Sequence, residues 1–82
     1  MDSRSTHRKR MLIGGKVLFN GGGSVLDCVV KDLSDGGARL AVEGALAVPQ
    51  KFNLRLSDGR VFNCTVRWRQ FGSLGVRFAP TM

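Results

Sequence analysis

One connection in this chain contains more chemically useful residues than a turn requires. Asp32, Ser34, Asp35, Gly36 and Gly37 lie together in the stretch KDLSDGGARL, between a run of β-branched residues and a second apolar run. A carboxylate accepts hydrogen bonds, a hydroxyl donates and accepts them, and a glycine lets a ligand approach the backbone closely. The stretch is therefore a candidate binding segment.

A second candidate is the basic N-terminal stretch. It contains four basic residues, Arg4, Arg8, Lys9 and Arg10, and one acidic residue, Asp2. A guanidinium group donates paired hydrogen bonds to phosphate or to the O6/N7 edge of guanine, and its plane stacks on a base. These residues suit a nucleotide ligand. A solvated tail that binds polyanions loosely is the alternative.

The residues needed for catalysis are poorly represented. The only histidine, His7, has no carboxylate arranged near it, and a solitary histidine in a basic tail is typical of solvated surface. No spacing of Cys, His, Asp or Glu resembles a zinc or calcium site, and no phosphate-binding loop is present. We expect no enzymatic activity, no metal and no bound cofactor.

The composition describes one small folded domain with an anionic partner. Its 82 residues form a thin core, and 43% hydrophobic and 23% charged residues are ordinary for a globular protein. The net charge of +7 points to a nucleotide, a nucleic acid or an anionic membrane surface.

The cysteines and the hydropathy pattern indicate a cytoplasmic protein. Cys28 and Cys64 lie far apart in apolar runs, as buried thiols in a reducing compartment do. Gly14, Gly15 and Lys16 interrupt the only apolar run after the basic start, so neither a secretory segment nor membrane insertion is expected.

The candidate residues are carried by a chain whose dominant period is two. The stretch RVFNCTVRW places Phe62, Cys64, Val66 and Trp68 on one face, which predicts that Trp68 points inward, and Asp58-Gly59 predicts a hairpin turn before it. One helical turn is expected before Pro49. The predicted strands are residues 16–20, 24–33, 37–42, 51–56, 60–68 and 73–78.

These strands predict an all-β fold, a small six-stranded antiparallel β-barrel. The expected organisation is a flexible basic ligand-binding arm over residues 1–15 and a barrel over residues 16–80. The ending APTM is too short for a C-terminal helix.

The motifs resemble those of the PilZ domain, the bacterial receptor module for cyclic di-GMP. Asp32 to Gly37 fit the pattern DxSxxG, Arg4 and Arg8 fit RxxxR, and the ending VRW…LGVRF looks like the last two strands of the family. The resemblance covers essentially the whole chain and implies a barrel with the N-terminal arm folded over one face.

The resemblance implies a role for each matching residue. Arg4 and Arg8 grip phosphates and guanines, Asp32 and Ser34 bond to guanine edges, and the backbone at Gly37 passes close to the ligand. Arg10 and Lys9 are expected helpers without a motif position. Trp68 is a candidate to abut the ligand, although core packing is the favoured reading of this residue.

Two departures from the family pattern leave questions open. Many members carry an arginine where this chain has Ser3, which leaves open whether the site takes one ligand molecule or a stacked pair. Many members also add a C-terminal helix, so a partner or a second copy, in a weak homodimer, is a candidate to cover the barrel end; a monomer is the alternative.

The favoured function is a cyclic di-GMP receptor that changes conformation on binding and signals to a protein partner. The alternatives are a ligand-free PilZ-like interaction module and a small basic barrel that binds single-stranded nucleic acid. Nucleic acid is less favoured, because such barrels present a row of exposed aromatic residues and this chain has no Tyr. The downstream process leaves no motif.

Overall fold

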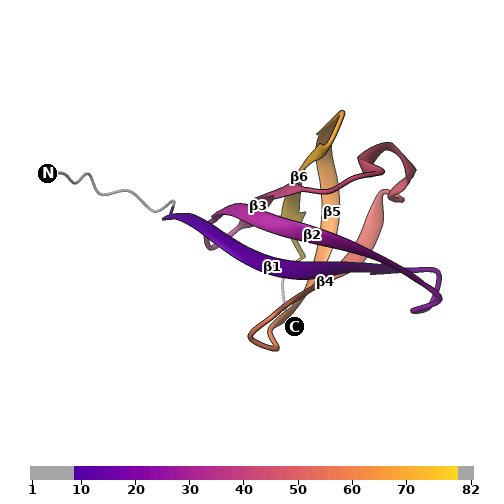
Figure 1. Cartoon of the computed structure of the whole chain (residues 1–82), viewed down its shortest axis with the longest axis horizontal. Coiled ribbons are helices and arrows are strands. Elements are labelled where there is room, and N and C mark those ends of the chain that lie inside the picture. The colour runs from indigo at the N-terminus through magenta and orange to yellow at the C-terminus, as the bar shows by residue number, and fades with distance from the viewer. Residues whose placement is uncertain (1–8, 80–82) are drawn as a thin grey trace, which may run out of the picture.

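The computed structural model describes residues 9–79 and confirms the six-stranded antiparallel barrel. The strands close in the order β1-β2-β3-β6-β5-β4, with β1 pairing both β2 and β4 (Figure 1). Their bounds are β1 Lys9–Phe19, β2 Ser24–Leu33, β3 Gly37–Ala41, β4 Lys51–Leu56, β5 Val61–Gln70 and β6 Ser73–Phe78.

The first strand begins earlier than the sequence pattern suggests. We expected it from Lys16, but β1 starts at Lys9, because residues 9–14 pair with the second half of β2. Gly15 lets β1 cross β4 closely: a β-carbon at this position would lie 3.0 Å from the Arg55 carbonyl oxygen. Residues 9–15, expected in the arm, are therefore barrel strand, while residues 1–8 lie outside the described residues.

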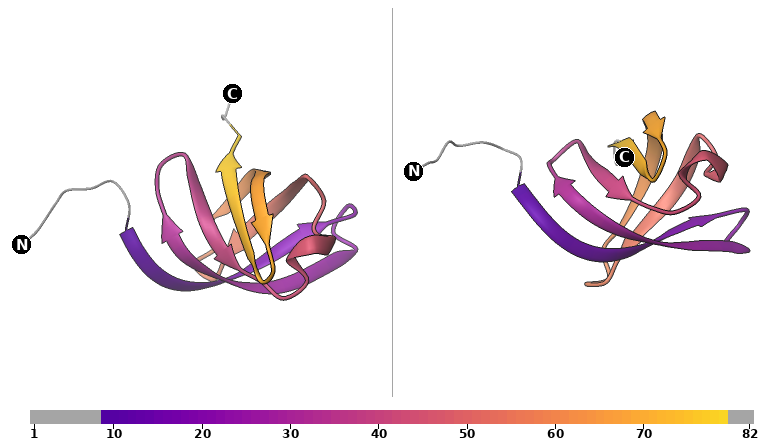
Figure 2. Two further views of the ribbon diagram at one scale, coloured as in Figure 1. Left: turned by 90° about the horizontal axis from the view of Figure 1, so that it is seen from above. Right: turned by 45° about the horizontal axis from the view of Figure 1, so that its top comes forward.

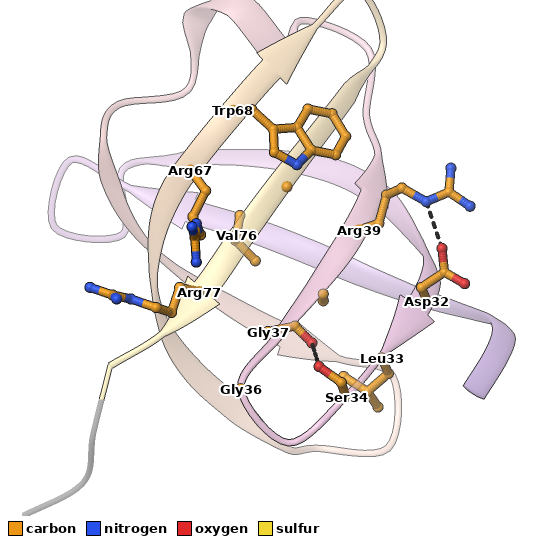
Figure 3. A pocket seen from close by; sticks show the side chains of 12 residues that line it. Asp32, Leu33, Ser34, Gly36, Gly37, Arg39, Arg67, Trp68, Val76 and Arg77 are labelled. Carbon is orange, nitrogen blue, oxygen red and sulfur yellow. Dashed lines mark hydrogen bonds and ion pairs between the residues drawn. The ribbon is translucent and has the colours of Figure 1, made fainter. Parts of the chain in front are cut away.

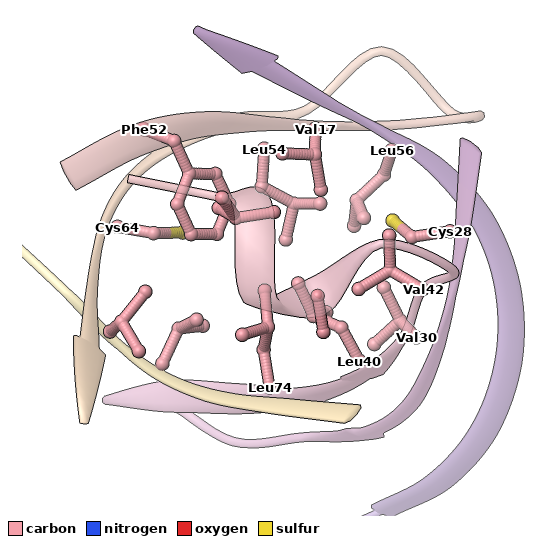
Figure 4. Close-up of a cluster of buried hydrophobic side chains, with 14 residues drawn as sticks. Val17, Cys28, Val30, Leu40, Val42, Phe52, Leu54, Leu56, Cys64 and Leu74 are labelled. Atoms are coloured by element: carbon pink, nitrogen blue, oxygen red, sulfur yellow. The ribbon is translucent and has the colours of Figure 1, made fainter. Parts of the chain in front are cut away.

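The barrel interior is filled by the inward-facing side chains of every strand (Figure 4). Alternation along β4 buries Phe52, Leu54 and Leu56 and exposes the residues between them, as expected for a half-buried strand. Both cysteines are buried and free. The remaining core residues are aliphatic: Val17, Val30, Leu40, Val42, Ala45, Val48, Val66, Leu74 and Val76.

Two local predictions about connections are confirmed. The β4–β5 turn contains Asp58 and Gly59, with Gly59 at φ 96°. The Arg60 backbone amide donates to Asp58 Oδ1 at 3.0 Å, and this bond is the main reason the Asp58 pKa lies below its ordinary value. The expected helical turn is the 3₁₀ helix η1, Ala45–Ala47.

Within residues 9–79, three β-bulges interrupt the regular alternation. They lie between Arg10 and Ile13 in β1, between Val30 and Asp32 in β2, and between Val66 and Trp68 in β5. A bulge adds one residue to one strand, so the side chains beyond it move to the other face of the sheet. The bulges in β2 and β5 decide which residues reach the site described next.

Candidate functional site

A cavity of about 400 Å³ lies on the outer face of four neighbouring strands, β2, β3, β6 and β5. Figure 3 shows Asp32 and Arg39 on one side of it, Arg67 and Arg77 on the other, and Trp68 between them in this view. The DxSxxG stretch, with Ser34 and Gly37, forms one end of this cavity. The β2–β3 and β5–β6 hairpins, which are separate in sequence, therefore meet at one pocket.

Asp32 reaches this face because of the bulge in β2. Val30 pairs with Leu40, which is buried, whereas Asp32 pairs with Arg39, so Lys31 is the extra residue. Without the bulge, Lys31 would stand opposite Arg39 and Asp32 would point to the interior. Arg39 Nε donates to Asp32 Oδ2 at 2.6 Å, which orients the carboxylate.

A β-bulge in β5 likewise turns Trp68 outward, so the prediction that this side chain faces the core was wrong. In β5, Val66 pairs with the buried Val76, but Trp68 pairs with Gly75, so Arg67 is the extra residue. The Trp68 side chain is 42% exposed and lines the pocket. It lies across Gly75, where a β-carbon would overlap the indole ring.

Ser34 and Gly37 form the turn between β2 and β3. The Ser34 amide donates to the Gly37 carbonyl oxygen at 2.9 Å, and the Ser34 hydroxyl donates to the same oxygen at 3.2 Å. Because the hydroxyl proton is engaged, Ser34 presents oxygen lone pairs to the pocket as acceptors.

The backbone of β6, a strand of the barrel itself, approaches Gly37 closely. Gly37 pairs with Arg77, and a β-carbon on Gly37 would overlap the Val76 carbonyl oxygen. Gly37 also lines the pocket. The expectation from the motif concerned approach to a ligand, whereas the contact in this structure is between β3 and β6. A structural requirement thus explains the glycine without any ligand.

Three arginines of the pocket were missed by the sequence analysis. Arg39, Arg67 and Arg77 each line it, from β3, β5 and β6. No motif marks them, and they read as ordinary exposed strand residues. The strand register is the signal that finds Arg39, since it stands opposite Asp32.

Of the remaining predicted residues, the structure places the backbone of Lys9 and Arg10 only. The backbone of Arg10 lies in β1 opposite Asp32, and that of Lys9 lies opposite Leu33, which lines the pocket. Arg4 and Arg8 lie outside the described residues. Among residues 9–79, no group of three or more His, Cys, Asp or Glu side chains gathers as metal ligands would.

The geometry therefore defines a small barrel that carries an arginine-lined pocket on its outer face, next to the DxSxxG turn. The chain belongs to the PilZ domain family, because the family model described as PilZ domain matches residues 2–82. PilZ domains are receptor modules for cyclic di-GMP and form a binding family rather than a catalytic one. No curated protein matches the chain.

Within residues 9–79, no helix reaches the length and apolar character required to cross a bilayer.

Proposed function

We propose that this protein is a cytoplasmic, non-enzymatic receptor that binds cyclic di-GMP in the pocket at the DxSxxG turn. The observation that carries the proposal is the pair of bulges in β2 and β5, which turn Asp32 and Trp68 onto the same outer face. A carboxylate and an aromatic plane together suit a purine base, since one bonds to the base edge while the other stacks on its face.

Asp32 recognises the Watson–Crick edge of a guanine. Guanine presents N1–H and N2–H donors, and Oδ1 of Asp32 accepts from them in the complex. The Arg39 guanidinium fixes the other oxygen at 2.6 Å, so the carboxylate is held in position before the ligand arrives. Such preorganisation lowers the entropic cost of binding.

The phosphodiesters of the ligand are bound by arginines. Arg67 and Arg77 lie across the pocket from Asp32 and supply positive charge there. The motif residues Arg4 and Arg8, with Arg10 as a helper, approach from the N-terminal side. Lys9 pairs with Leu33, which lines the pocket, so β1 begins beside it. Trp68 supplies the stacking surface.

Binding is expected to change the surface that the protein presents to a partner. Arg4 and Arg8 contact the ligand, and the charge around the pocket falls as phosphodiesters neutralise arginines. A protein effector that reads this altered surface converts nucleotide binding into a signal.

Calorimetric titration of the purified protein with cyclic di-GMP tests the proposal. We expect saturable binding, and Arg8→Ala or Asp32→Ala should each weaken it by about 5-fold to 150-fold, since a lost base or phosphate contact costs about 1–3 kcal/mol. Arg55→Ala is the matched control, because Arg55 lies on β4, outside the pocket. An absence of saturable heat at high ligand concentration would refute the proposal.

The alternative nucleic-acid function is distinguished by the salt dependence of binding. Contacts spread along many phosphates weaken steeply as salt rises, whereas a defined dinucleotide site loses affinity less. We expect cyclic di-GMP to retain binding at a salt concentration that abolishes binding of a single-stranded oligonucleotide.

A further inference from the structure

The first half of β2 has an edge that no described strand covers. β2 pairs with β1 from Ser24 to Leu33, but with β3 only from Val29 onward. Within residues 9–79, the segment Ser24–Cys28 therefore has a strand on one side only. Alternate residues of such a segment direct their N–H and C=O groups to the open side. Figures 1 and 2 show this end of the β1–β2 hairpin projecting beyond the other strands.

A groove runs along this open edge. Its volume is about 640 Å³, and it separates the edge from residues 41–43 and Gly72. Val25 and Val29 line it with exposed apolar side chains, and Phe71, beside Gly72, is 89% exposed. Exposed apolar side chains beside unpaired backbone groups are what an added strand covers.

The charge of the groove is opposite to that of the protein. Asp27 and Glu43 line it, and none of the lysines or arginines among the described residues does, although the chain has 13 lysines and arginines against 6 acidic residues. Lys16 pairs with Asp27 from the neighbouring strand, but the Asp27 side chain remains 83% exposed. A basic side chain entering the groove would therefore gain a favourable electrostatic contact.

We propose that Ser24–Cys28 accepts an extended segment of a partner protein as an additional antiparallel strand. Val25, Asp27 and Val29 share one face, so the segment carries apolar residues at two alternate positions with a lysine or arginine between them. The edge is about 17 Å long, enough for about five residues. A second copy of this chain fits less well, because two molecules of net charge +7 repel each other.

This inference deepens the proposed receptor function by naming the surface that meets the effector. The assignment of the bound partner as a signalling effector rests on the proposed function, whereas the binding of a strand does not. The groove lies at the opposite end of β2 from Asp32. The peptide-binding test is made without nucleotide, so a failure to bind peptide and a failure to bind cyclic di-GMP are read separately.

The test is selection from a displayed library of random peptides, with the full-length protein as bait. We expect enriched sequences with the alternating apolar–basic–apolar pattern. A synthetic copy of one such peptide should slow the hydrogen exchange of alternate backbone amides within Ser24–Cys28, measured by NMR.

Variants locate the binding site. Asp27→Lys combined with Glu43→Lys should weaken the selected peptide by at least tenfold, and Val25→Thr should weaken it measurably. Val61→Thr, at a similarly exposed valine on β5, should have no effect. The proposal is overturned if no peptide is enriched, if the variants bind the peptide as well as the parent does, or if the edge amides become protected on concentrating the protein alone, which would identify a second copy as the occupant.

Discussion

Arg39 and Asp32 stand directly opposite each other across β3 and β2, and Arg39 Nε donates to Asp32 Oδ2 at 2.6 Å. The Asp32 side chain is only 17% exposed. The bulge after Val30 creates this pairing, since it shifts the register by one residue. The ion pair thus fixes the carboxylate that we assign to base recognition.

Arg39→Ala should weaken cyclic di-GMP binding by about tenfold, because Asp32 loses the group that orients its carboxylate before the ligand arrives. The free energy of unfolding should fall by no more than about 1 kcal/mol, since a partly exposed ion pair contributes little to stability. Calorimetry and urea denaturation measure the two quantities.

Arg39→Lys keeps the charge without the planar donor group, so it should restore only part of the affinity. Lys16→Ala, which removes the exposed ion pair to Asp27, is the control and should leave binding unchanged. Equal affinity in Arg39→Ala and the parent protein would show that Asp32 needs no positioning.

The indole ring of Trp68 depends on the missing side chain of Gly75. In Gly75→Ala the new β-carbon would overlap the ring, so Trp68 must leave its place over β6. Stacking on a base is worth about 1–3 kcal/mol, so ligand affinity should fall between about 5-fold and 150-fold. Trp68 is the only tryptophan, and its emission should report the displacement.

Trp68→Phe is the matched comparison, since it keeps an aromatic plane without changing Gly75. This variant should bind more tightly than Gly75→Ala. If Gly75→Ala folds normally, shifts the tryptophan emission and still binds as the parent does, Trp68 is not a stacking surface.

Gly36 and Gly37 are adjacent, but they should respond differently to substitution. A β-carbon at Gly36 meets nothing within 4 Å, whereas one at Gly37 would overlap the Val76 carbonyl oxygen. Gly37→Ala must therefore separate β3 from β6 and should cost about 1–3 kcal/mol of stability.

Thermal or urea denaturation measures the difference, with Gly36→Ala as the control that should stay within about 0.5 kcal/mol of the parent. Similar stability in the two variants would mean that the barrel relaxes around Gly37, and the glycine would then be better explained by ligand approach alone.

The two thiols should be unreactive while the protein is folded. Burial is the main cause that raises the pKa of Cys28 to about 11 and that of Cys64 to about 12, from an ordinary 9.0. At pH 8 the reactive thiolate is therefore scarce, about one molecule in a thousand for Cys28. A thiol reagent should label the protein in urea far faster than in buffer.

The same shifts give a pH dependence of stability. Because the folded pKa values exceed those of the unfolded chain, the contribution of the thiols is fully present below pH 9 and is lost as the pH rises from 9 toward 11 and 12. The urea midpoint should fall over this range, and less so in the Cys28→Ala/Cys64→Ala double variant. An identical fall in both proteins would assign the effect to other groups.

The strands could be predicted from the sequence because alternation and turn residues are local. The pattern in KFNLRL and the Asp58-Gly59 turn need no distant partner to be read, and both are found as expected. The start of β1 could not be read in the same way. Residues 9–14 form a strand because β2 is long enough to pair with them.

The candidate site was predictable only where a motif marks it. Asp32 and Ser34 were found from their spacing, but the outward turn of Trp68 was missed, because simple alternation carries this residue inward. A bulge depends on how two strands match in length and register, which one strand alone does not encode. Arg39 was missed for the same reason, since its partnership with Asp32 exists only in the paired sheet.

The most direct test of the account is the fluorescence of Trp68 during titration with cyclic di-GMP. We predict a saturable change in emission that is absent with GTP at the same concentrations and that requires at least about fivefold more cyclic di-GMP in Asp32→Ala. The account is contradicted if the emission is unchanged while calorimetry shows binding, which would place the ligand elsewhere, or if Asp32→Ala gives the same titration curve as the parent protein.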